Sequence, residues 1–277
     1  MPDETMSAEA AGPAASRGAD SSAATPPPAV RTAAVIPAAG RGVRLGRGAP
    51  KALRPLGGTP MLIHAVRAVA RARTVSLVVV VAPPDGAAAV RTLLDEHPLP
   101  DSAASAEVMV VPGGETRQES VARGLAALPD DVTVVLVHDA ARPLVPVETV
   151  EAVAAAVRDG APAVVPALPV TDTVKQIAPP SGDFAPGAPE PVVATPERSL
   201  LRAVQTPQGF DRAILAKAHE HAPREGEGAT DDAGLVERLG VPVVLVPGHE
   251  EAFKVTRPLD LVLAEAVLAR RRATDGF

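Results

Sequence analysis

The sequence contains no cysteine, no tryptophan and no tyrosine, and only four phenylalanines. Without cysteine the chain has no disulfide, no thiolate nucleophile and no cysteine-ligated metal centre. The scarcity of aromatic rings removes the stacking platform on which many proteins hold single-stranded nucleic acids. A hydrophobic core must therefore consist mainly of valine, leucine, alanine and isoleucine.

Other absences narrow the class of protein further. No segment approaches the ~18 consecutive apolar residues of a membrane span. The N-terminal sequence MPDETMSAEA is acidic and lacks the apolar segment of a secretory signal. The net charge of -6 argues against a general nucleic-acid binder. We therefore expect a soluble cytoplasmic protein with neither nucleic acid nor membrane among its partners.

Composition also divides the chain into a tail and a folded part. Residues 1–31 are rich in alanine, serine, proline and glycine and show no hydrophobic periodicity. Such a segment cannot bury enough apolar surface to offset the entropy lost on ordering, so we predict a disordered tail. We assign residues 32–277 to a single domain.

Valine-rich runs alternate with helical patterns along that domain. Predicted strands cover residues 33–38, 75–82, 106–111, 132–139, 162–167 and 241–247, and predicted helices cover 60–72, 86–97, 115–128, 147–159, 211–221, 230–239 and 258–271. Near-continuous apolar strands separated by helices are typical of a parallel sheet covered on both faces. The sequence thus predicts an α/β fold with a doubly wound, mainly parallel, Rossmann-like sheet.

The alternation breaks between residues 168 and 206. Polar residues interrupt the extended pattern of 168–178, residues 179–191 are rich in proline and glycine, and 192–206 returns to the domain. We interpret this region as a projecting β-arm. Because the bare edges of such an arm need a cover, and a second subunit is a common one, we predict a homodimer formed through it.

The stretch VIPAAGRGVRLGRGAPKALRPLGG, residues 35–58, follows the first predicted strand and contains five cations and no acidic residue. Ligands of α/β proteins bind at the carboxyl ends of strands, where glycines allow close approach and cations neutralise phosphates. The stretch does not match the pattern GxxxxGK[ST], and Leu45 stands where a dinucleotide-binding loop has its third glycine. An NAD-dependent oxidoreductase is therefore disfavoured, and a solvated basic loop is the structural alternative.

Three further stretches could line the same edge of the sheet. In VLVHDAARPLV, residues 135–145, Asp139 ends a strand and suits Mg²⁺, although turn aspartates are common. The glycine pair of GGETRQESVARG, residues 113–124, could read a base edge or bind an anion, or could simply precede a capped helix. In FKVTRPLD, Lys254 is one of only four lysines in the chain and stands at an element boundary.

Other polar residues receive structural interpretations. Thr230 can cap a helix that begins near Asp231. We interpret His138 as structural, because no second histidine or carboxylate stands at ligand spacing. His219 and His221 are two residues apart, so they do not share a helix face, and we interpret both as solvent-exposed.

Seven segments together resemble a known family. AAVIPAAGRGVRLGRGAPKALRPLGGTPML, GGETRQESV, VHDAARP, DTVK, TPQGF, ATDD and FKVTRPLDL are similar, in this order, to segments of the 2-C-methyl-D-erythritol 4-phosphate cytidylyltransferases of the nonmevalonate isoprenoid pathway. The resemblance runs from about Thr32 to Arg270. It implies a nucleotidyltransferase-type domain that converts CTP and methylerythritol phosphate to CDP-methylerythritol and pyrophosphate with Mg²⁺, by in-line attack and without a covalent enzyme intermediate.

The resemblance also implies roles for individual residues. It makes Arg44, Lys51 and Lys254 the catalytic charge stabilisers. It places the nucleotide against Pro37, Ala38, Ala39, Gly40, Gly114, Glu115, Ser120 and Ala140. It places the second substrate against Asp139, Arg142, Thr173, Arg198, Thr230 and Thr256, with Asp139 also facing the metal. Thr173 and Arg198, on the arm, would reach the active site of the other subunit of a homodimer.

Two alternatives stay open at this point. Ribitol 5-phosphate cytidylyltransferases share the loop, the CTP site and the arm, and a few hydrogen bonds separate the two polyol phosphates. A non-catalytic nucleotide-binding homologue is the second, although it would not need Arg44, Lys51, Asp139 and Lys254 together. Glu115 stands where aspartate is common in the family. The chain ends after its last predicted helix, so we expect a monofunctional enzyme.

Overall fold

The computed structural model describes residues 30–40, 50–103, 106–178, 189–222 and 229–274. Residues 1–29 of the predicted tail, Arg44 and residues 179–188 of the arm lie outside the described residues. The strands are β1 (Arg31–Pro37), β2 (Pro55–Leu56), β3 (Thr59–Pro60), β4 (Val75–Ala82), β5 (Glu107–Pro112), β6 (Val132–Val137), β7 (Ala163–Pro169), β8 (Gln176–Ile177), β9 (Val192–Ala194), β10 (Arg202–Val204), β11 (Gln208–Asp211) and β12 (Val244–Pro247). The α-helices are α1 (Met61–Ala70), α2 (Ala87–Asp95), α3 (Arg117–Ala126), α4 (Val147–Arg158), α5 (Arg212–Glu220), α6 (Asp232–Arg238) and α7 (Pro258–Thr274).

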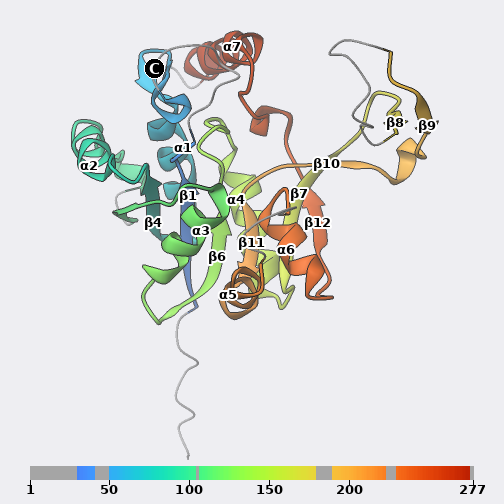
Figure 1. Cartoon of the computed structure of the whole chain (residues 1–277). Helices are drawn as coiled ribbons and strands as arrows, with labels where there is room; N and C mark the ends of the chain where they lie inside the picture. Colours follow the sequence, from blue (N-terminus) through green and yellow to red (C-terminus); the bar gives the residue numbers. More distant parts are fainter. Residues whose placement is uncertain (1–29, 41–49, 104–105, 179–188, 223–228, 275–277) are drawn as a thin grey trace, which may run out of the picture.

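The central sheet is mixed and mostly parallel, as the sequence predicted (Figure 1). Its strands follow the order β10-β7-β11-β6-β1-β4-β5, and β12 pairs with β7 off this path. Strands β6, β1, β4 and β5 run parallel to one another, whereas β11 is antiparallel to both β6 and β7. Strand β11 was not predicted from the sequence, because its four residues, QGFD, include a single large apolar side chain.

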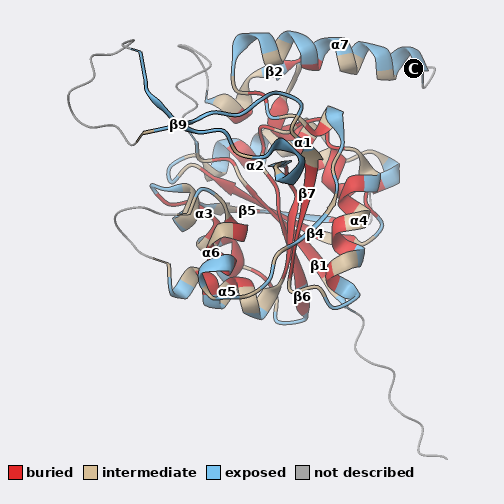
Figure 2. Cartoon of the chain, turned by 90° about the vertical axis from the view of Figure 1, so that its right-hand side faces the viewer, coloured by how far each residue is buried: buried red, intermediate tan, exposed pale blue. Residues whose placement is uncertain are grey.

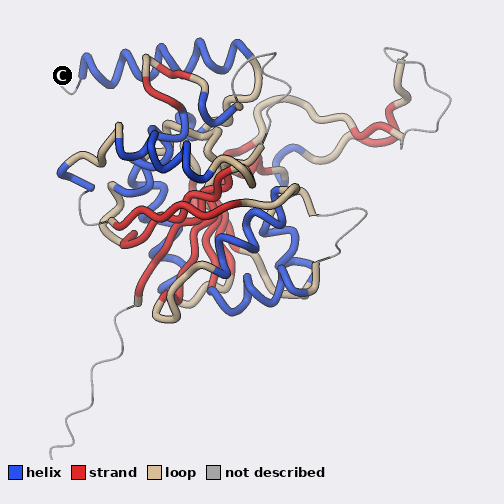
Figure 3. Tube along the Cα trace, turned by 60° about the vertical axis from the view of Figure 1, so that its left-hand side comes forward, coloured by secondary structure: helices blue, strands red, loops and turns tan. Residues whose placement is uncertain are grey.

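Helices cover both faces of the sheet, and the core lies between them (Figures 2 and 3). In β1, Ala34 and Ile36 pack on one face with residues of α1, α2 and α4, whereas Ala33 and Val35 pack on the other with α3, α5 and α6. Successive residues of a strand point to opposite faces of the sheet. A strand is therefore apolar at nearly every position only when both faces of its sheet are covered. The valine-rich runs therefore form a three-layer α/β fold.

The arm extends away from this body as a hairpin of β8 and β9 (Figures 1 and 3). Its described strands are shorter than predicted, two and three residues long. The region that the sequence analysis gave to the arm also includes sheet residues at both ends, because β7 runs to Pro169 and pairs with β10. Ile177, Val192 and Val193 expose apolar side chains on it.

None of the helices in the part of the chain that the structure describes is long and apolar enough to cross a bilayer.

Candidate active site

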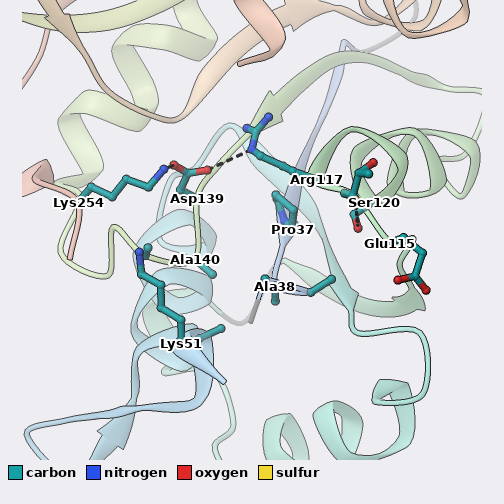
Figure 4. Close-up of a pocket in the computed structure, with 14 residues that line it drawn as sticks. Pro37, Ala38, Lys51, Glu115, Arg117, Ser120, Asp139, Ala140 and Lys254 are labelled. Carbon is teal, nitrogen blue, oxygen red and sulfur yellow. Dashed lines mark hydrogen bonds and ion pairs between the residues drawn. The ribbon is translucent and has the colours of Figure 1, made fainter. Parts of the chain in front are cut away.

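A pocket of about 180 Å³ opens at the carboxyl ends of β1 and β6 (Figure 4). Five segments distant in the sequence meet there: the residues after β1, the start of the 3₁₀ helix Lys51–Leu53, the turn before α3, the turn after β6, and the residues before α7. Its walls consist of Pro37, Ala38, Ala39, Gly40, Lys51, Ala52, Glu115, Thr116, Arg117, Ser120, Asp139, Ala140, Ala141 and Lys254. This is the edge at which open α/β sheets bind their ligands.

The two lysines of the pocket are both anchored by buried neighbours in the chain. Ala52 is 5% exposed and packs into the core, which fixes the backbone that carries Lys51. Val255 is fully buried, and its amide donates to the carbonyl of Ala141 at 2.8 Å, which ties the Lys254 segment to the turn after β6. The protein thus holds two ammonium groups, from opposite ends of the chain, at one pocket.

The turn before α3 is tightly packed and capped. Thr116 caps the helix, and its hydroxyl and the Glu119 carboxylate form a reciprocal capping box. A Cβ at Gly113 would lie 2.7 Å from the carbonyl oxygen of Ala82, and one at Gly114 would overlap the side chain of Glu119. The Gly114 amide donates to the Ser120 hydroxyl at 3.2 Å. Glycine is therefore required at both positions, because the backbone there passes close to β4 and to Glu119. Glu115, the next residue, is exposed at the pocket.

Asp139 is the charged centre of the pocket. Its carboxylate lies 2.7 Å from Nζ of Lys254 and 3.5 Å from Nε of Arg117, and its side chain is 12% exposed (Figure 4). Burial opposes ionisation, yet Arg117 and Lys254 together hold the pKa of Asp139 well below its usual range. The group is therefore a carboxylate at neutral pH.

His138 precedes Asp139 in the chain and is not part of the pocket lining. It is fully buried, and its ring nitrogens contact the Thr206 hydroxyl and the Arg142 carbonyl, both at 3.1 Å. Burial lowers the pKa of His138 to about 4, so the ring is neutral at pH 7. These contacts give it the structural role that the sequence indicated.

Arg117 is the charged residue of the pocket lining that sequence reasoning missed. Its Nη1 lies 2.7 Å from Asp232, whose second carboxylate oxygen lies 2.9 Å from Nε2 of His219. The side chain of His219 is 4% exposed, so its interpretation as a solvent group was wrong. Its partner, Asp232, lies thirteen residues later on another helix, so the spacing of His219 and His221 gave no indication of this contact.

The chain is similar to known proteins of one family. A sequence model of the family 2-C-methyl-D-erythritol 4-phosphate cytidylyltransferase matches residues 32–270. The chain belongs to this family. The cytidylyltransferase of that name from Streptomyces coelicolor is 72% identical over 89% of this chain and 88% of its own length, and the one from Frankia casuarinae is 55% identical over 88% and 84%.

Solved structures of the cytidylyltransferase family share the fold. The enzyme from Thermus thermophilus superposes with a TM-score of 0.62 at 38% identity, covering 84% of this chain and 97% of that one. The synthase from Anaerococcus prevotii superposes with a TM-score of 0.71 at 27% identity, covering 87% and 96%. The fold predicted from the alternation of strands and helices is therefore the fold of this family.

Most of the predicted site residues line the pocket. These residues are Pro37, Ala38, Ala39, Gly40, Lys51, Glu115, Ser120, Asp139, Ala140 and Lys254. Gly114 lies behind them, buried against Ser120 and Glu119. Arg44 lies outside the described residues.

The remaining predicted residues lie apart from the pocket lining. Arg142 donates to the carbonyls of Ala252 and Val204, and Thr256 donates to the Asp260 carboxylate through both its amide and its hydroxyl. Thr230 is exposed and does not cap α6. That cap is Asp231, which accepts from the Gly234 amide, because α6 begins at Asp232.

Thr173 and Arg198 are exposed on the arm. Arg198 donates to the carbonyl of Thr171 at 2.7 Å, so its described contact lies within the arm itself.

Proposed function

We propose that this chain transfers the cytidylyl group of CTP to 2-C-methyl-D-erythritol 4-phosphate, which forms 4-diphosphocytidyl-2-C-methyl-D-erythritol and releases pyrophosphate. The observation that carries this proposal is the convergence of Lys51, Asp139 and Lys254 on one pocket of a chain that belongs to the cytidylyltransferase family. The relatives from Streptomyces coelicolor and Frankia casuarinae carry the name of this activity.

The reaction is a displacement at the α-phosphorus of CTP. A phosphate oxygen of methylerythritol phosphate attacks that phosphorus in line, a new P–O bond forms, and the bond to the pyrophosphate oxygen breaks. Such chemistry depends mostly on positioning and on neutralising charge. The side chain of Ser120 is buried and bonded to backbone groups, so it is not presented as a nucleophile. Lys51 and Lys254 supply positive charge where the phosphates meet.

Asp139 is the residue that we propose to hold Mg²⁺. Among the described residues no group of three or more histidine and acidic side chains gathers that could bind a metal alone. Mg²⁺ usually binds through one or two carboxylates together with substrate phosphates. A single ionised Asp139 in the pocket proposed to bind CTP fits this pattern. When bound, the ion would neutralise charge on the triphosphate.

We also propose that the protein is a homodimer joined through its arm. Exposed apolar side chains on β8 and β9 support this, since such edges are commonly covered by another chain. In the dimer Arg198 and Thr173 would bind the substrate phosphate in the pocket of the other subunit.

Pyrophosphate release tests the proposed reaction. We expect release with Mg²⁺, CTP and methylerythritol 4-phosphate, and little with ATP, GTP or UTP. No release from the first mixture would contradict the proposal. Faster turnover with ribitol 5-phosphate would instead assign the chain to that reaction.

A further inference from the structure

A chain of contacts between polar side chains runs from the protein interior to the pocket. His219 on α5 contacts Asp232 at the start of α6, Asp232 contacts Arg117 at the start of α3, and Arg117 contacts Asp139, which in turn contacts Lys254. The distances, in this order, are 2.9, 2.7, 3.5 and 2.7 Å. The close-up shows the outer part of this chain, with Arg117 and Lys254 on opposite sides of the Asp139 carboxylate (Figure 4).

Asp232, toward the interior end of this chain, is more buried than the two cations at the pocket. The side chain of Asp232 is 1% exposed, that of Arg117 is 35% exposed, and that of Lys254 is 41% exposed. Arg117 and Lys254 line the pocket, whereas Asp232 and His219 do not. The side-chain contact that links Asp232 to the pocket lining is therefore the one with Arg117.

The fold of α6 does not need the carboxylate of Asp232 as a cap. The neighbouring Asp231 already caps the helix and also accepts a hydrogen bond from the Gln208 amide. Burial opposes ionisation of Asp232, but the hydrogen bond from His219 and the charge of Arg117 lower its pKa. A buried carboxylate that is not required for the helix end is therefore kept ionised beside Arg117.

Its contact with Arg117 determines how that guanidinium meets Asp139. Arg117 places Nη1 on Asp232 and only Nε near Oδ1 of Asp139, at a long 3.5 Å. An arginine without a second partner tends to bind a carboxylate through two parallel hydrogen bonds. Such a pair would occupy both oxygens of Asp139, including Oδ2, which now faces Lys254.

We propose that Asp232 is a positioning residue: it draws the guanidinium of Arg117 away from Asp139, so that Oδ2 stays available to Lys254 and the ligand. His219 holds the other oxygen of Asp232 and so fixes its orientation. The inference rests on the proposed cytidylyl transfer for its kinetic readout, but its structural readout does not depend on turnover.

A double-mutant cycle tests this with Asp232→Asn, Arg117→Gln and the double variant. We expect Asp232→Asn to lower kcat about tenfold and to change the KM for CTP less than about threefold. The substitution changes the contacts among Arg117, Asp139 and Lys254, and it leaves the residues proposed to bind the nucleotide in place. The double variant should match Arg117→Gln within about twofold, since Asp232 acts only through Arg117. Equal effects of Asp232→Asn with and without Arg117 would overturn the proposal.

Two controls separate positioning from stability. Asp231→Ala removes the cap of the same helix and should lower Tm while leaving the kcat of the folded enzyme within about twofold. An equal loss of kcat in Asp231→Ala would assign the effect to α6 packing and overturn the proposal. If Asp232→Asn does not fold, the comparison of kcat between Arg117→Gln and the double variant still tests whether Asp232 acts through Arg117. The double variant removes the charges of both residues, so it leaves neither of them without its partner.

A measurement without turnover makes the outcome independent of the proposed function. With only four lysines in the chain, ¹³C-methylation gives few NMR signals, and Lys254→Arg assigns that of Lys254. We expect Asp232→Asn to shift the Lys254 signal when Arg117 is present, and to leave it unchanged in the Arg117→Gln variant. An unchanged signal in both would overturn the positioning role, whereas absent pyrophosphate release by the wild type would contradict the proposed function alone.

Discussion

In the pocket, charged side chains meet partners from different elements of the domain, whereas the described side-chain contacts of Arg198 and Lys175 stay within the arm. Asp139, Arg117 and Lys254 come from three segments and lie on a base of buried residues. On the arm, Arg198 donates to Thr171, and Lys175 donates to the Thr195 hydroxyl. The pocket is therefore positioned by the core of its own chain, while the arm presents side chains that the core of its own chain does not hold.

The largest expected effect lies on the pocket side of this comparison. Lys51→Ala should lower kcat at least ~10²-fold, because removal of a charge stabiliser acts on the transition state. Steady-state kinetics with CTP and methylerythritol phosphate measures it. Lys217→Ala, an exposed lysine on α5, is the matched control and should leave kcat unchanged. A rise in KM alone for Lys51→Ala would make Lys51 a binding residue only.

On the arm, loss of a charge should be felt in the other subunit. Arg198→Ala should lower kcat/KM about tenfold or more if its guanidinium binds the substrate phosphate there. Mixed dimers of Arg198→Ala with Lys51→Ala chains should regain activity, because one of their two pockets then has both residues. Failure of the mixture to exceed either parent would place Arg198 outside the partner's site.

The buried His138, next to Asp139 in the chain, predicts a pH dependence of stability. Burial lowers the pKa of His138 to about 4, below its value in the unfolded chain, so between these values only the unfolded state binds the proton. Stability should thus fall as the pH is lowered from 7 to 5, by about 2 kcal/mol from this group. Urea unfolding measures it, and His138→Gln should flatten the slope. An unchanged slope in that variant would assign the dependence to other groups.

The smallest effect on folding is expected on the exposed face of the arm. Val193 is 57% exposed, so Val193→Asp should leave the free energy of unfolding within about 0.5 kcal/mol at protein concentrations where the wild type is monomeric. The same substitution should weaken the dimer in sedimentation analysis. A wild-type protein that stays monomeric at every concentration would contradict the role of the arm and end the contrast with the pocket.

The elements with strong periodicity were predictable, and the cross-chain contacts were not. The position of Asp139 at a sheet edge followed from the valine-rich strand before it, and Lys51 and Lys254 stood out as rare lysines. Arg117 in GGETRQES is indistinguishable, by sequence, from a solvated charge at a helix start. Its role depends on Asp232, more than a hundred residues away, and the two are brought together only by packing of α3, α5 and α6.

The start of α6 shows the same limit at shorter range. Thr230 and Asp231 are both good cap residues, so sequence preference alone does not choose between them. The structure chooses Asp231, whose second oxygen also accepts a hydrogen bond from Gln208 on β11, a strand that the sequence did not reveal.

The stereochemical course at the α-phosphorus tests most directly whether the substrate phosphate displaces pyrophosphate in one step. One diastereomer of the α-thio analogue of CTP is turned over with methylerythritol phosphate, and the configuration of the product is determined by ³¹P NMR. We expect inversion, since a single in-line displacement inverts the configuration at phosphorus. Retention would require two displacements and an enzyme-bound intermediate, and would contradict it.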